Sequence, residues 1–396
     1  MSIIEVKGLT KIFGPEPKRA IALMEKGKSK DAIYKETKLT VGVNRASFSI
    51  EPGEIFVIMG LSGSGKSTLV RLLNRLIEPT DGQVLINGQD IVRMSREELR
   101  DVRRKKISMV FQKFALFPHR TVLENVEYGL EIQGIPKPQR TELGMKALEL
   151  VGLAERADSL PDQLSGGMQQ RVGLARGLAN DPDVLLMDEA FSALDPLIRK
   201  DMQDELLDLQ SRMKKTIVFI THDLDEALRI GDRIALMKDG VIVQIGTPEE
   251  IMITPANDYV ERFVEDVDLS KVLTASHVMK RPVTMALDRG PRVALQFMKE
   301  HGVSNVYVIG ENRKLLGVVT AEDASRAVRD GLKIMDILIE EVPCVSPDTI
   351  LNDLFDQLSQ TKVPLAVIDD QRRLKGIIIR GTVLAALAGI SDLGGK

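Results

Sequence analysis

Short, nearly continuous apolar runs are the clearest feature of the first 250 or so residues. Three of them are Glu54–Gly60 (EIFVIMG), Asp183–Glu189 (DVLLMDE) and Thr216–Thr221 (TIVFIT), each bounded by turn residues. Such runs are typical of strands that are buried on both faces of a mostly parallel sheet. Because helical patterns lie between the runs, this part of the chain is predicted to form an α/β domain.

An alternating strand pattern begins at Ser2, breaks off at Gly14 and resumes near Val41. The enclosed segment is polar and shows two short helical clusters around Gly27, so we predict a helical insertion over residues 15–42. Basic residues outnumber acidic ones in it. A solvated helical hairpin and a basic contact with a partner or an anionic surface are both compatible with this pattern. The basic residues are Lys18, Arg19, Lys26, Lys28, Lys30, Lys35 and Lys38.

The last third of the chain contains an internal repeat. Aligning Val283 with Val342 also aligns Gly317 with Gly376, at a constant offset of 59 residues. Two copies of one small unit most simply pack against each other and complete a core that neither would complete alone. The predicted elements are helices at Ala294–His301 and Leu351–Ser359, and strands at Val306–Ile309, Leu316–Thr320, Leu365–Ile368 and Lys375–Ile379.

These patterns set the expected domain boundaries. We place the first domain at residues 1–265 and the two repeat units at 271–331 and 332–396. The linker is expected within Pro255–Ser270, with residues 266–270 joining the domains.

Composition limits the classes of partner. The 396 residues carry 54 basic and 57 acidic side chains, a net charge of −3, so no global positive field is available to hold nucleic acid. The one cysteine, Cys344, cannot form an internal disulfide, and we expect it to be a small buried apolar residue.

Targeting signals and membrane spans are not evident in the sequence. The first residues lack a secretion-signal pattern, and the longest apolar stretch, Gly376–Ile390, is interrupted by Arg380. We therefore expect a cytoplasmic protein whose relation to any membrane runs through a partner.

The segment Gly60–Ser67 (GLSGSGKS) matches the phosphate-loop pattern G-x-x-x-x-G-K-[ST], and it lies between an apolar run and a helical pattern. Its glycines let successive backbone N–H groups face one phosphate chain. Lys66 would reach the terminal phosphates, and the Ser67 hydroxyl would ligate Mg²⁺. The loop therefore predicts a nucleoside triphosphate and Mg²⁺ as ligands, but by itself it does not choose among kinases, GTPases and ATPases.

A carboxylate pair follows the second apolar run. Asp188 at the strand end would hold magnesium, and Glu189 beside it would polarise the attacking water. Two carboxylates here favour hydrolysis over phosphoryl transfer to a hydroxyl. The absence of an Asn-Lys-x-Asp motif argues against a GTPase.

The segment Leu164–Gln170 (LSGGMQQ) offers a second anion-binding helix start, since a helical pattern follows it. The ordered set GLSGSGKS, Gln112, LSGGMQQ, LLMDE, SALD at 192–195 and His222 resembles the nucleotide-binding subunit of ABC transporters over about residues 3–264. The resemblance implies an α/β ABC ATPase fold with a mostly parallel sheet and a helical subdomain. It also implies a head-to-tail homodimer with two ATP molecules between the chains.

The resemblance assigns roles by motif. It makes Glu189 the general base, and gives catalytic roles also to His222 and Lys66. Phe13 would stack on adenine, Asp195 would couple the two sites, and Gln112 would contact the metal together with Ser67 and Asp188. The implied nucleotide-binding residues are Phe13, Gly60, Leu61, Ser62, Gly63, Ser64, Gly65, Lys66, Ser67, Thr68, Gln112, Ser165, Gly166, Gly167, Gln169 and Asp195.

Details of these motifs resemble one branch of the family. Met168 stands where many members have glutamine, Ala190-Phe191 follows Glu189 where proline is common, and the phrase VFQKFALFPHRTVLENV surrounds Gln112. Together they are similar to the ATPase subunits of glycine betaine and proline betaine importers. Such a subunit would act with a transmembrane permease and a substrate-binding protein or domain.

The repeat units resemble CBS domains, an α+β tandem pair that importers of this branch carry after the ATPase. Residues 317–323 (GVVTAED) match G-x-x-T-x-x-D, so Thr320 and Asp323 would bind an adenine nucleotide or a cyclic dinucleotide. The second copy has Ile379 and Thr382 at these positions, so at most one such site is expected per chain. A purely structural CBS pair is the alternative.

Other functions remain open from the sequence alone. The chain could energise import of a different small solute. A soluble ABC ATPase acting on nucleic acid or ribosomes would use the same motifs, but the net charge and the lack of an aromatic-rich basic stripe argue against nucleic acid as a partner.

Overall fold

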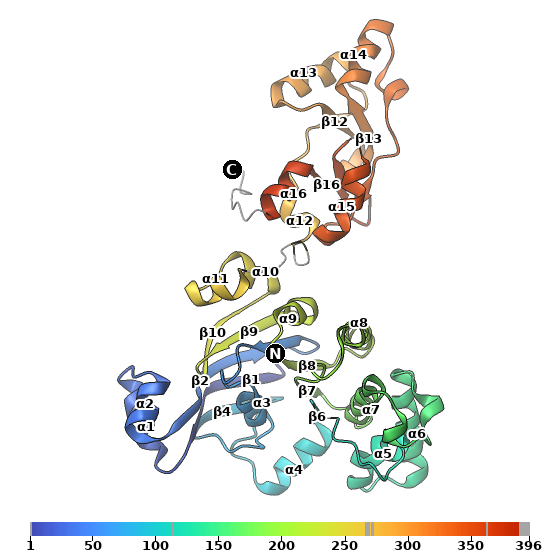
Figure 1. The fold of residues 1–396 in the computed structure, drawn as a ribbon. Helices are drawn as coiled ribbons and strands as arrows, with labels where there is room; N and C mark the ends of the chain where they lie inside the picture. Colours follow the sequence, from blue (N-terminus) through green and yellow to red (C-terminus); the bar gives the residue numbers. More distant parts are fainter. Residues whose placement is uncertain (1, 113, 266–269, 271–272, 362, 388–396) are drawn as a thin grey trace. The chain divides into compact units, whose positions relative to one another are not determined.

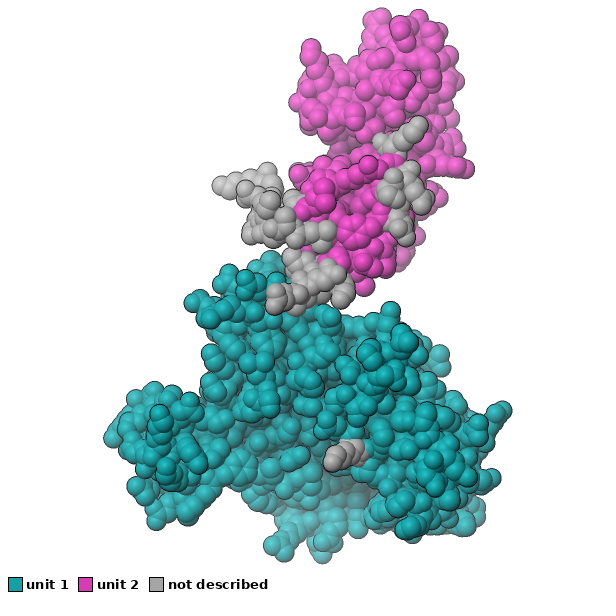
Figure 2. Space-filling model, in the orientation of Figure 1, with its two compact units in different colours: residues 1–266 teal, residues 267–396 magenta. Residues whose placement is uncertain are grey.

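The computed structural model describes residues 2–112, 114–265, 270, 273–361 and 363–387. The chain divides into two compact units, residues 1–266 and 267–396, which Figure 2 shows in different colours. Each unit is considered by itself below.

A six-stranded sheet forms the centre of unit 1 (Figure 1). The strand order is β10-β9-β3-β8-β7-β6, and all neighbouring pairs are parallel except β9 with β10. The three predicted apolar runs form the fully buried strands β3, β7 and β8, which confirms the mostly parallel α/β fold. The strands are β3 (Ile55–Met59), β6 (Ile107–Phe111), β7 (Val184–Asp188), β8 (Thr216–Thr221), β9 (Arg233–Lys238) and β10 (Val241–Gly246).

This topology gathers the predicted chemistry at one edge of the sheet. Strand β3 ends directly before Gly60, β7 ends at Asp188, and β8 ends directly before His222. Because neighbouring parallel strands end at the same edge, the three motifs must lie together.

An antiparallel sheet of order β2-β1-β4-β5 lies beside the central sheet and shares its hydrophobic core. Ile4 and Phe48 of this sheet pack in one cluster with Phe56 and Ile58 of β3. The strands are β1 (Ile4–Phe13), β2 (Thr40–Ile50), β4 (Asp81–Ile86) and β5 (Gln89–Asp90).

The helices of unit 1 form distinct groups. Figure 1 shows α5, α6 and α7 gathered on one side of the unit, and they form the predicted helical subdomain. Their bounds are α5 (Val122–Ile132), α6 (Lys137–Leu150) and α7 (Gly166–Leu178), with short 3-10 turns at Ala154–Arg156 and Pro161–Gln163. The other helices are α3 (Lys66–Leu73), α4 (Arg96–Lys105), α8 (Pro196–Met213), α9 (Leu224–Ile230), α10 (Pro248–Ile253) and α11 (Asp258–Val264).

The predicted insertion is a pair of helices, α1 (Pro17–Glu25) and α2 (Lys30–Thr37). Gly27 between them has a positive φ of 74°, a conformation that glycine adopts without steric cost. The pair lies on the side of unit 1 away from α5–α7 (Figure 1). It is anchored by a small core in which Ala20 and Ile33 pack with Ile12 of β1.

Unit 2 contains the predicted repeat. Two three-stranded sheets, β11-β12-β13 and β14-β15-β16, have the same topology of one parallel and one antiparallel pair. Tyr307 of the first copy and Ala366 of the second share one core cluster, so the copies complete each other. The first copy has α12 (Ala275–Val278), β11 (Thr284–Ala286), α13 (Pro291–His301), β12 (Asn305–Ile309), β13 (Leu315–Thr320) and α14 (Ala321–Asp330). The second has β14 (Cys344–Val345), α15 (Leu351–Gln360), β15 (Leu365–Ile368), β16 (Leu374–Ile378) and α16 (Arg380–Leu387), and 3-10 turns lie at Glu311–Arg313 and Ile334–Ile337.

Two expectations from the sequence differ from the structure. The segment expected as linker contains helix α11, because Asn257 caps the backbone N–H groups of Tyr259 and Val260 and starts a helix there. Cys344 is half-buried rather than buried, and its thiol donates to the Val342 carbonyl at 3.1 Å. Among the described residues, no helix is long and apolar enough to cross a membrane.

Candidate functional site

The loop after β3 depends on glycine at two places. Gly60 and Gly65 have positive φ values of 147° and 106°. A Cβ atom on Gly65 would lie 2.3 Å from the Gly42 carbonyl oxygen, and one on Gly60 would lie 2.2 Å from the Met237 carbonyl oxygen. The loop therefore has both the backbone shape and the close packing that the phosphate-loop motif requires.

Lys66 begins helix α3 and is folded back over its own loop. Its Nζ atom donates to the carbonyl oxygens of Gly60 (2.8 Å) and Leu61 (3.2 Å). Burial lowers the pKa of this ammonium, whereas the charges of Glu189 and Asp188 raise it. Lys66 is thus a desolvated cation at the edge of a cavity, where an anion gains the most from it.

Asp188 and Ser67 form a pair of oxygen donors. The Ser67 hydroxyl donates to the Asp188 Oδ1 atom at 3.3 Å, and Arg71 lies 3.8 Å from the other carboxylate oxygen. Burial raises the pKa of Asp188, and Arg71 and Ser67 oppose that shift. Hydroxyl and carboxylate oxygens suit Mg²⁺, which takes few protein ligands and completes its shell with water and phosphate. Accordingly, the described residues contain no larger cluster of metal-ligating side chains.

Glu189 and His222 face each other across the site. The His222 Nδ1 atom lies 3.5 Å from the Glu189 Oε2 atom. Glu189 has a φ of 49°, a left-handed conformation that costs a non-glycine residue about 1–3 kcal/mol. Its backbone N–H donates to the Ile220 carbonyl at 3.1 Å, so the neighbouring strand β8 holds it in this conformation.

Phe13 ends strand β1 and presents an exposed ring. A Cβ atom on Gly42 would lie 2.8 Å from that ring, so glycine at this position lets the ring lie against β2. The ring also has the Lys11 ammonium 5.1 Å from its centroid. An exposed, positioned aromatic face can stack on a nucleobase.

Most of these groups line one cavity of about 650 Å³, whereas Gly60, Ser64 and Asp188 are not among its lining residues. The cavity joins the Phe13 ring, the phosphate loop, Glu189 and His222. Sequence reasoning missed three of its lining residues, Lys30, Thr40 and Gly42, because none belongs to a motif. The lining residues are Phe13, Lys30, Thr40, Gly42, Leu61, Ser62, Gly63, Gly65, Lys66, Ser67, Thr68, Glu189 and His222.

Gln112 follows strand β6 and does not line this cavity. Its Nε2 atom donates to the Ser192 hydroxyl at 2.9 Å, and that hydroxyl donates to the Glu189 carbonyl at 2.9 Å. Gln112, which the resemblance assigns to the metal site, is therefore tied to the loop after Glu189.

The LSGGMQQ residues lie apart from the cavity in the same chain. Ser165 caps helix α7 by accepting from the Met168 N–H, and Asp195 caps α8 by accepting from the Ile198 N–H. Gln169 donates to the carbonyls of Pro161 and Leu164, so its amide supports the preceding loop. Ser165, Gly166 and Asp195 are exposed, while Gly167 is buried against Ile198.

Arg199, which belongs to none of the motifs, connects the loop before α8 to the segment that follows β8. Its Nη2 atom donates to the Leu194 carbonyl at 3.1 Å, and its Nη1 atom donates to the Asp223 carboxylate at 3.4 Å. It thus links the loop around Asp195 to the residue after His222.

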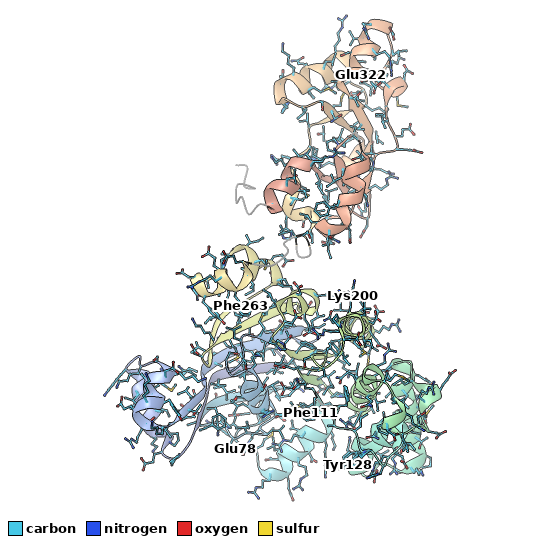
Figure 3. The ribbon with its side chains drawn as sticks, viewed as in Figure 1. Glu78, Phe111, Tyr128, Lys200, Phe263 and Glu322 are labelled. Carbon is cyan, nitrogen blue, oxygen red and sulfur yellow. The ribbon has the colours of Figure 1, made fainter. Side chains whose placement is uncertain are left out.

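In unit 2, Thr320 and Asp323 lie at the start of α14, on either side of Glu322, which Figure 3 labels. The Thr320 hydroxyl donates to the Asp323 carboxylate at 2.7 Å, and Arg326 pairs with the same carboxylate at 2.7 Å. In the second copy, the Thr382 hydroxyl is buried and donates to the Ile379 carbonyl. The two copies therefore differ at these positions.

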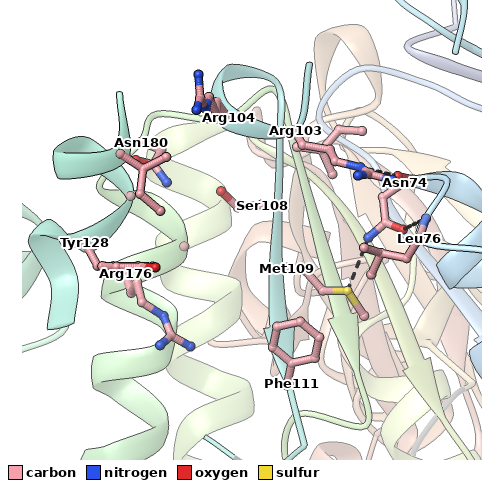
Figure 4. Close-up of a pocket in the computed structure, with 14 residues that line it drawn as sticks. Asn74, Leu76, Arg103, Arg104, Ser108, Met109, Phe111, Tyr128, Arg176 and Asn180 are labelled. Atoms are coloured by element: carbon pink, nitrogen blue, oxygen red, sulfur yellow. Dashed lines mark hydrogen bonds between the residues drawn. The ribbon is translucent and has the colours of Figure 1, made fainter. Parts of the chain in front are cut away.

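A separate groove of about 310 Å³ lies along strand β6. Figure 4 shows Met109 and Phe111 of β6 between Asn74 and Arg103 on one side and Tyr128, Arg176 and Asn180 on the other. Leu76, Phe111 and Ile132 are exposed there. The lining residues are Asn74, Leu76, Arg103, Arg104, Ile107, Ser108, Met109, Phe111, Tyr128, Gly129, Ile132, Arg176, Gly177 and Asn180.

Comparison with protein families gives matches to both units. The ABC transporter family profile matches residues 43–192, and the CBS domain profile matches residues 275–330 and 334–389. The two CBS matches begin 59 residues apart, the offset at which the sequence repeats.

Individual relatives match almost the whole chain. The glycine betaine transport ATP-binding protein OpuAA of Bacillus subtilis is 63% identical over 98% of this chain and 93% of its own length. The glycine betaine/carnitine transport ATP-binding protein GbuA of Listeria monocytogenes is 60% identical over 98% of both. A solved dimer of the ATP-binding cassette MJ0796 with ADP and phosphate is 32% identical, with a TM-score of 0.52, over 62% of this chain and 98% of that one.

Proposed function

The chain belongs to the ATP-binding subunits of glycine betaine ABC transporters, and from this premise we propose how its own residues bind ATP, hydrolyse it and couple hydrolysis to transport. It is an ATPase subunit of an importer for an osmoprotectant such as glycine betaine, and it carries a tandem CBS pair. The observation that carries the mechanism is the single cavity shared by Phe13, the phosphate loop, Glu189 and His222.

ATP lies with its adenine on the Phe13 ring and its phosphates against the backbone N–H groups of residues 60–68. The Lys66 ammonium then gives up its hydrogen bonds to the Gly60 and Leu61 carbonyls and donates to phosphate oxygens instead. This exchange is favourable because phosphate is an anion and the ammonium is already desolvated. Ser67 and Asp188 would hold Mg²⁺, which would neutralise charge on the phosphates.

Glu189 is the general base for hydrolysis. Its carboxylate accepts a proton from the attacking water, while His222, 3.5 Å away, contacts the γ-phosphate side of the cavity. The left-handed backbone at Glu189 fixes the direction of the carboxylate before ATP arrives.

The second half of each site comes from another copy of the chain. Ser165, Gly166 and Asp195 are exposed and lie apart from their own cavity, so their anion-binding helix start is available to a partner. The dimeric state of the related cassette with ADP and phosphate supports a head-to-tail homodimer.

The permease docks in the groove along β6. Strand β6 lines this groove and ends at Phe111, directly before Gln112. A permease segment bound in the groove would therefore lie beside Gln112, whose amide is hydrogen-bonded to Ser192 in the loop after Glu189. The exposed apolar residues suit a short amphipathic helix, and Arg103, Arg104 and Arg176 favour acidic residues on it. Through this contact the subunit is held peripherally at the cytoplasmic face of the membrane, where the permease works with a substrate-binding protein or domain.

The CBS pair regulates transport by binding an adenine nucleotide or a cyclic dinucleotide at Thr320 and Asp323. The difference between the two copies supports one site per chain. Titrating the full-length protein with AMP and cyclic dinucleotides, in the presence of saturating ADP that occupies the ATPase cavity, tests this, with Asp323→Asn as the variant. Binding that the variant does not weaken contradicts the assignment.

The direct test of the ATPase proposal is phosphate release by the permease-bound complex. We expect Mg²⁺-dependent ATPase activity that Lys66→Ala abolishes. Turnover that survives this variant would contradict the site.

A further inference from the structure

Lys30 differs from the other basic residues of the inserted helices. It is half-buried, whereas Lys18, Arg19, Lys26, Lys28, Lys35 and Lys38 are exposed. Its Nζ atom donates to the Gly63 carbonyl at 3.1 Å, and the residue lines the same cavity as Phe13. Lys30 therefore connects helix α2 of the insertion to the phosphate loop.

The position of Lys30 is fixed by the fold. It is the first residue of α2, whose cap Ser29 accepts from the Ala32 N–H. Ile33, one turn further on, packs in a core with Ile12 and Val41, the neighbours of Phe13 and Gly42. The end of β1 and the start of β2 carry Phe13 and Gly42, which line the cavity. The same strand ends pack against helix α2, which carries Lys30.

The Lys30 ammonium has hydrogen-bond donors that its contact with Gly63 does not use. It carries three donors, of which the Gly63 carbonyl takes one. Among the described residues, no carboxylate forms an ion pair with it, whereas Lys28 pairs with Glu36 on the same insertion. Its neighbour Gly63 belongs to the loop whose N–H groups face phosphate.

We propose that Lys30 is a further nucleotide-binding residue, whose ammonium contacts the polyphosphate chain of ATP and ADP. This inference rests on the nucleotide site proposed above. It makes the insertion a part of that site rather than a separate surface appendage.

The role differs from that of Lys66. Lys30 is half-buried, and its ammonium is hydrogen-bonded to the Gly63 carbonyl rather than to Glu189 or His222, so we expect it to interact equally with the bound nucleotide and with the transition state. Such uniform binding changes the dissociation constant and the KM but leaves kcat unaltered. Because the group is partly exposed, salt should screen its contribution.

The test is equilibrium binding of ATP and of ADP, each with Mg²⁺, to the full-length protein. Lys30→Met removes the ammonium and keeps the alkyl stem, and Lys35→Met is the matched control on the same helix. We expect Lys30→Met to weaken both nucleotides by about threefold to tenfold, the value of one charge-assisted hydrogen bond at a half-exposed site. Lys35→Met should stay within the error of the wild type in both nucleotide affinity and kcat.

Salt dependence separates a direct contact from a structural effect. If Lys30 contacts phosphate, the affinity of the wild type falls more steeply with ionic strength than that of Lys30→Met. Equal affinity of the two methionine variants, or parallel salt dependences of Lys30→Met and wild type, would overturn the role of Lys30 alone. A wild-type protein that bound no ATP would overturn the nucleotide site itself.

Discussion

The Gln112 amide donates to the Ser192 hydroxyl at 2.9 Å, and this bond joins the end of strand β6 to the loop that follows Glu189, the proposed general base. The same hydroxyl donates to the backbone carbonyl of Glu189. A force on the groove along β6, where we propose that the permease docks, would therefore have a continuous path of bonds to the proposed hydrolytic centre.

The Gln112–Ser192 bond should oppose metal binding, because it holds the Gln112 amide toward the loop. A hydrogen bond of this kind contributes about 0.5–1.5 kcal/mol, which corresponds to a factor of about 2–10. We expect Ser192→Ala to lower the Mg²⁺ concentration for half-maximal ATPase activity by such a factor. Ser192→Thr, which keeps the hydroxyl, should resemble the wild type. An unchanged Mg²⁺ dependence in the alanine variant would show that Gln112 does not exchange partners.

Removing the base at Glu189 should separate binding from chemistry. Glu189→Gln keeps the size of the side chain and loses proton acceptance, so turnover should fall by about 10²–10⁴-fold. ATP affinity should be retained, and the ATP-bound dimer should accumulate in size-exclusion chromatography. Turnover close to that of the wild type would remove Glu189 from its role.

A charge in the groove along β6 should impair docking without affecting the isolated ATPase. Ile132 is 44% exposed and lines the groove, so Ile132→Glu places an unpaired carboxylate where an apolar partner would pack. We expect loss of permease co-purification and of transport, with basal ATPase activity retained. Leu150→Glu, at an equally exposed apolar position on α6 outside the groove, is the control. Equal co-purification of both variants would place the permease elsewhere.

Glu226 should make stability depend on pH. Burial raises the pKa of its carboxyl, while hydrogen bonds from Thr221 and Gln203 oppose the shift. Because the folded protein keeps this proton to a higher pH than the unfolded chain, the stability contribution falls as pH rises above the unfolded pKa. Glu226→Gln does not titrate, so its Tm relative to wild type should increase as the pH rises above about 4.3, the pKa of an unperturbed glutamate, and level off once the pH exceeds the raised pKa of Glu226 in the folded protein. A Tm difference independent of pH would contradict this.

The chemistry of the site could be predicted from the sequence because motif order and strand ends determine it together. The buried strands β3, β7 and β8 are neighbours in a parallel sheet and end at the same edge. The segments that follow them, GLSGSGKS, Asp188-Glu189 and His222, must therefore lie close together. The repeat at an offset of 59 residues likewise predicted the two matching sheets of unit 2, because two segments with the same pattern of apolar and polar residues form the same strands and helices.

Contacts between distant segments could not be predicted in this way. Lys30 reaches Gly63 across 33 residues, and its place depends on how the α1–α2 core packs, which no local pattern encodes. The Gln112–Ser192 bond spans 80 residues and is a matter of side-chain orientation. Helix α11 was missed because the cap at Asn257 lies among turn-forming residues that also suit a linker.

The most direct test of the central claim is uptake of labelled glycine betaine by cells that carry or lack this gene, at low and at high external osmolarity. Cells expressing Lys66→Ala serve as the inactive control. We expect osmotically stimulated uptake to be lost both in the deletion strain and in cells expressing the Lys66 variant. Unchanged uptake in the deletion strain, with no redundant transporter present, would contradict the role in glycine betaine import.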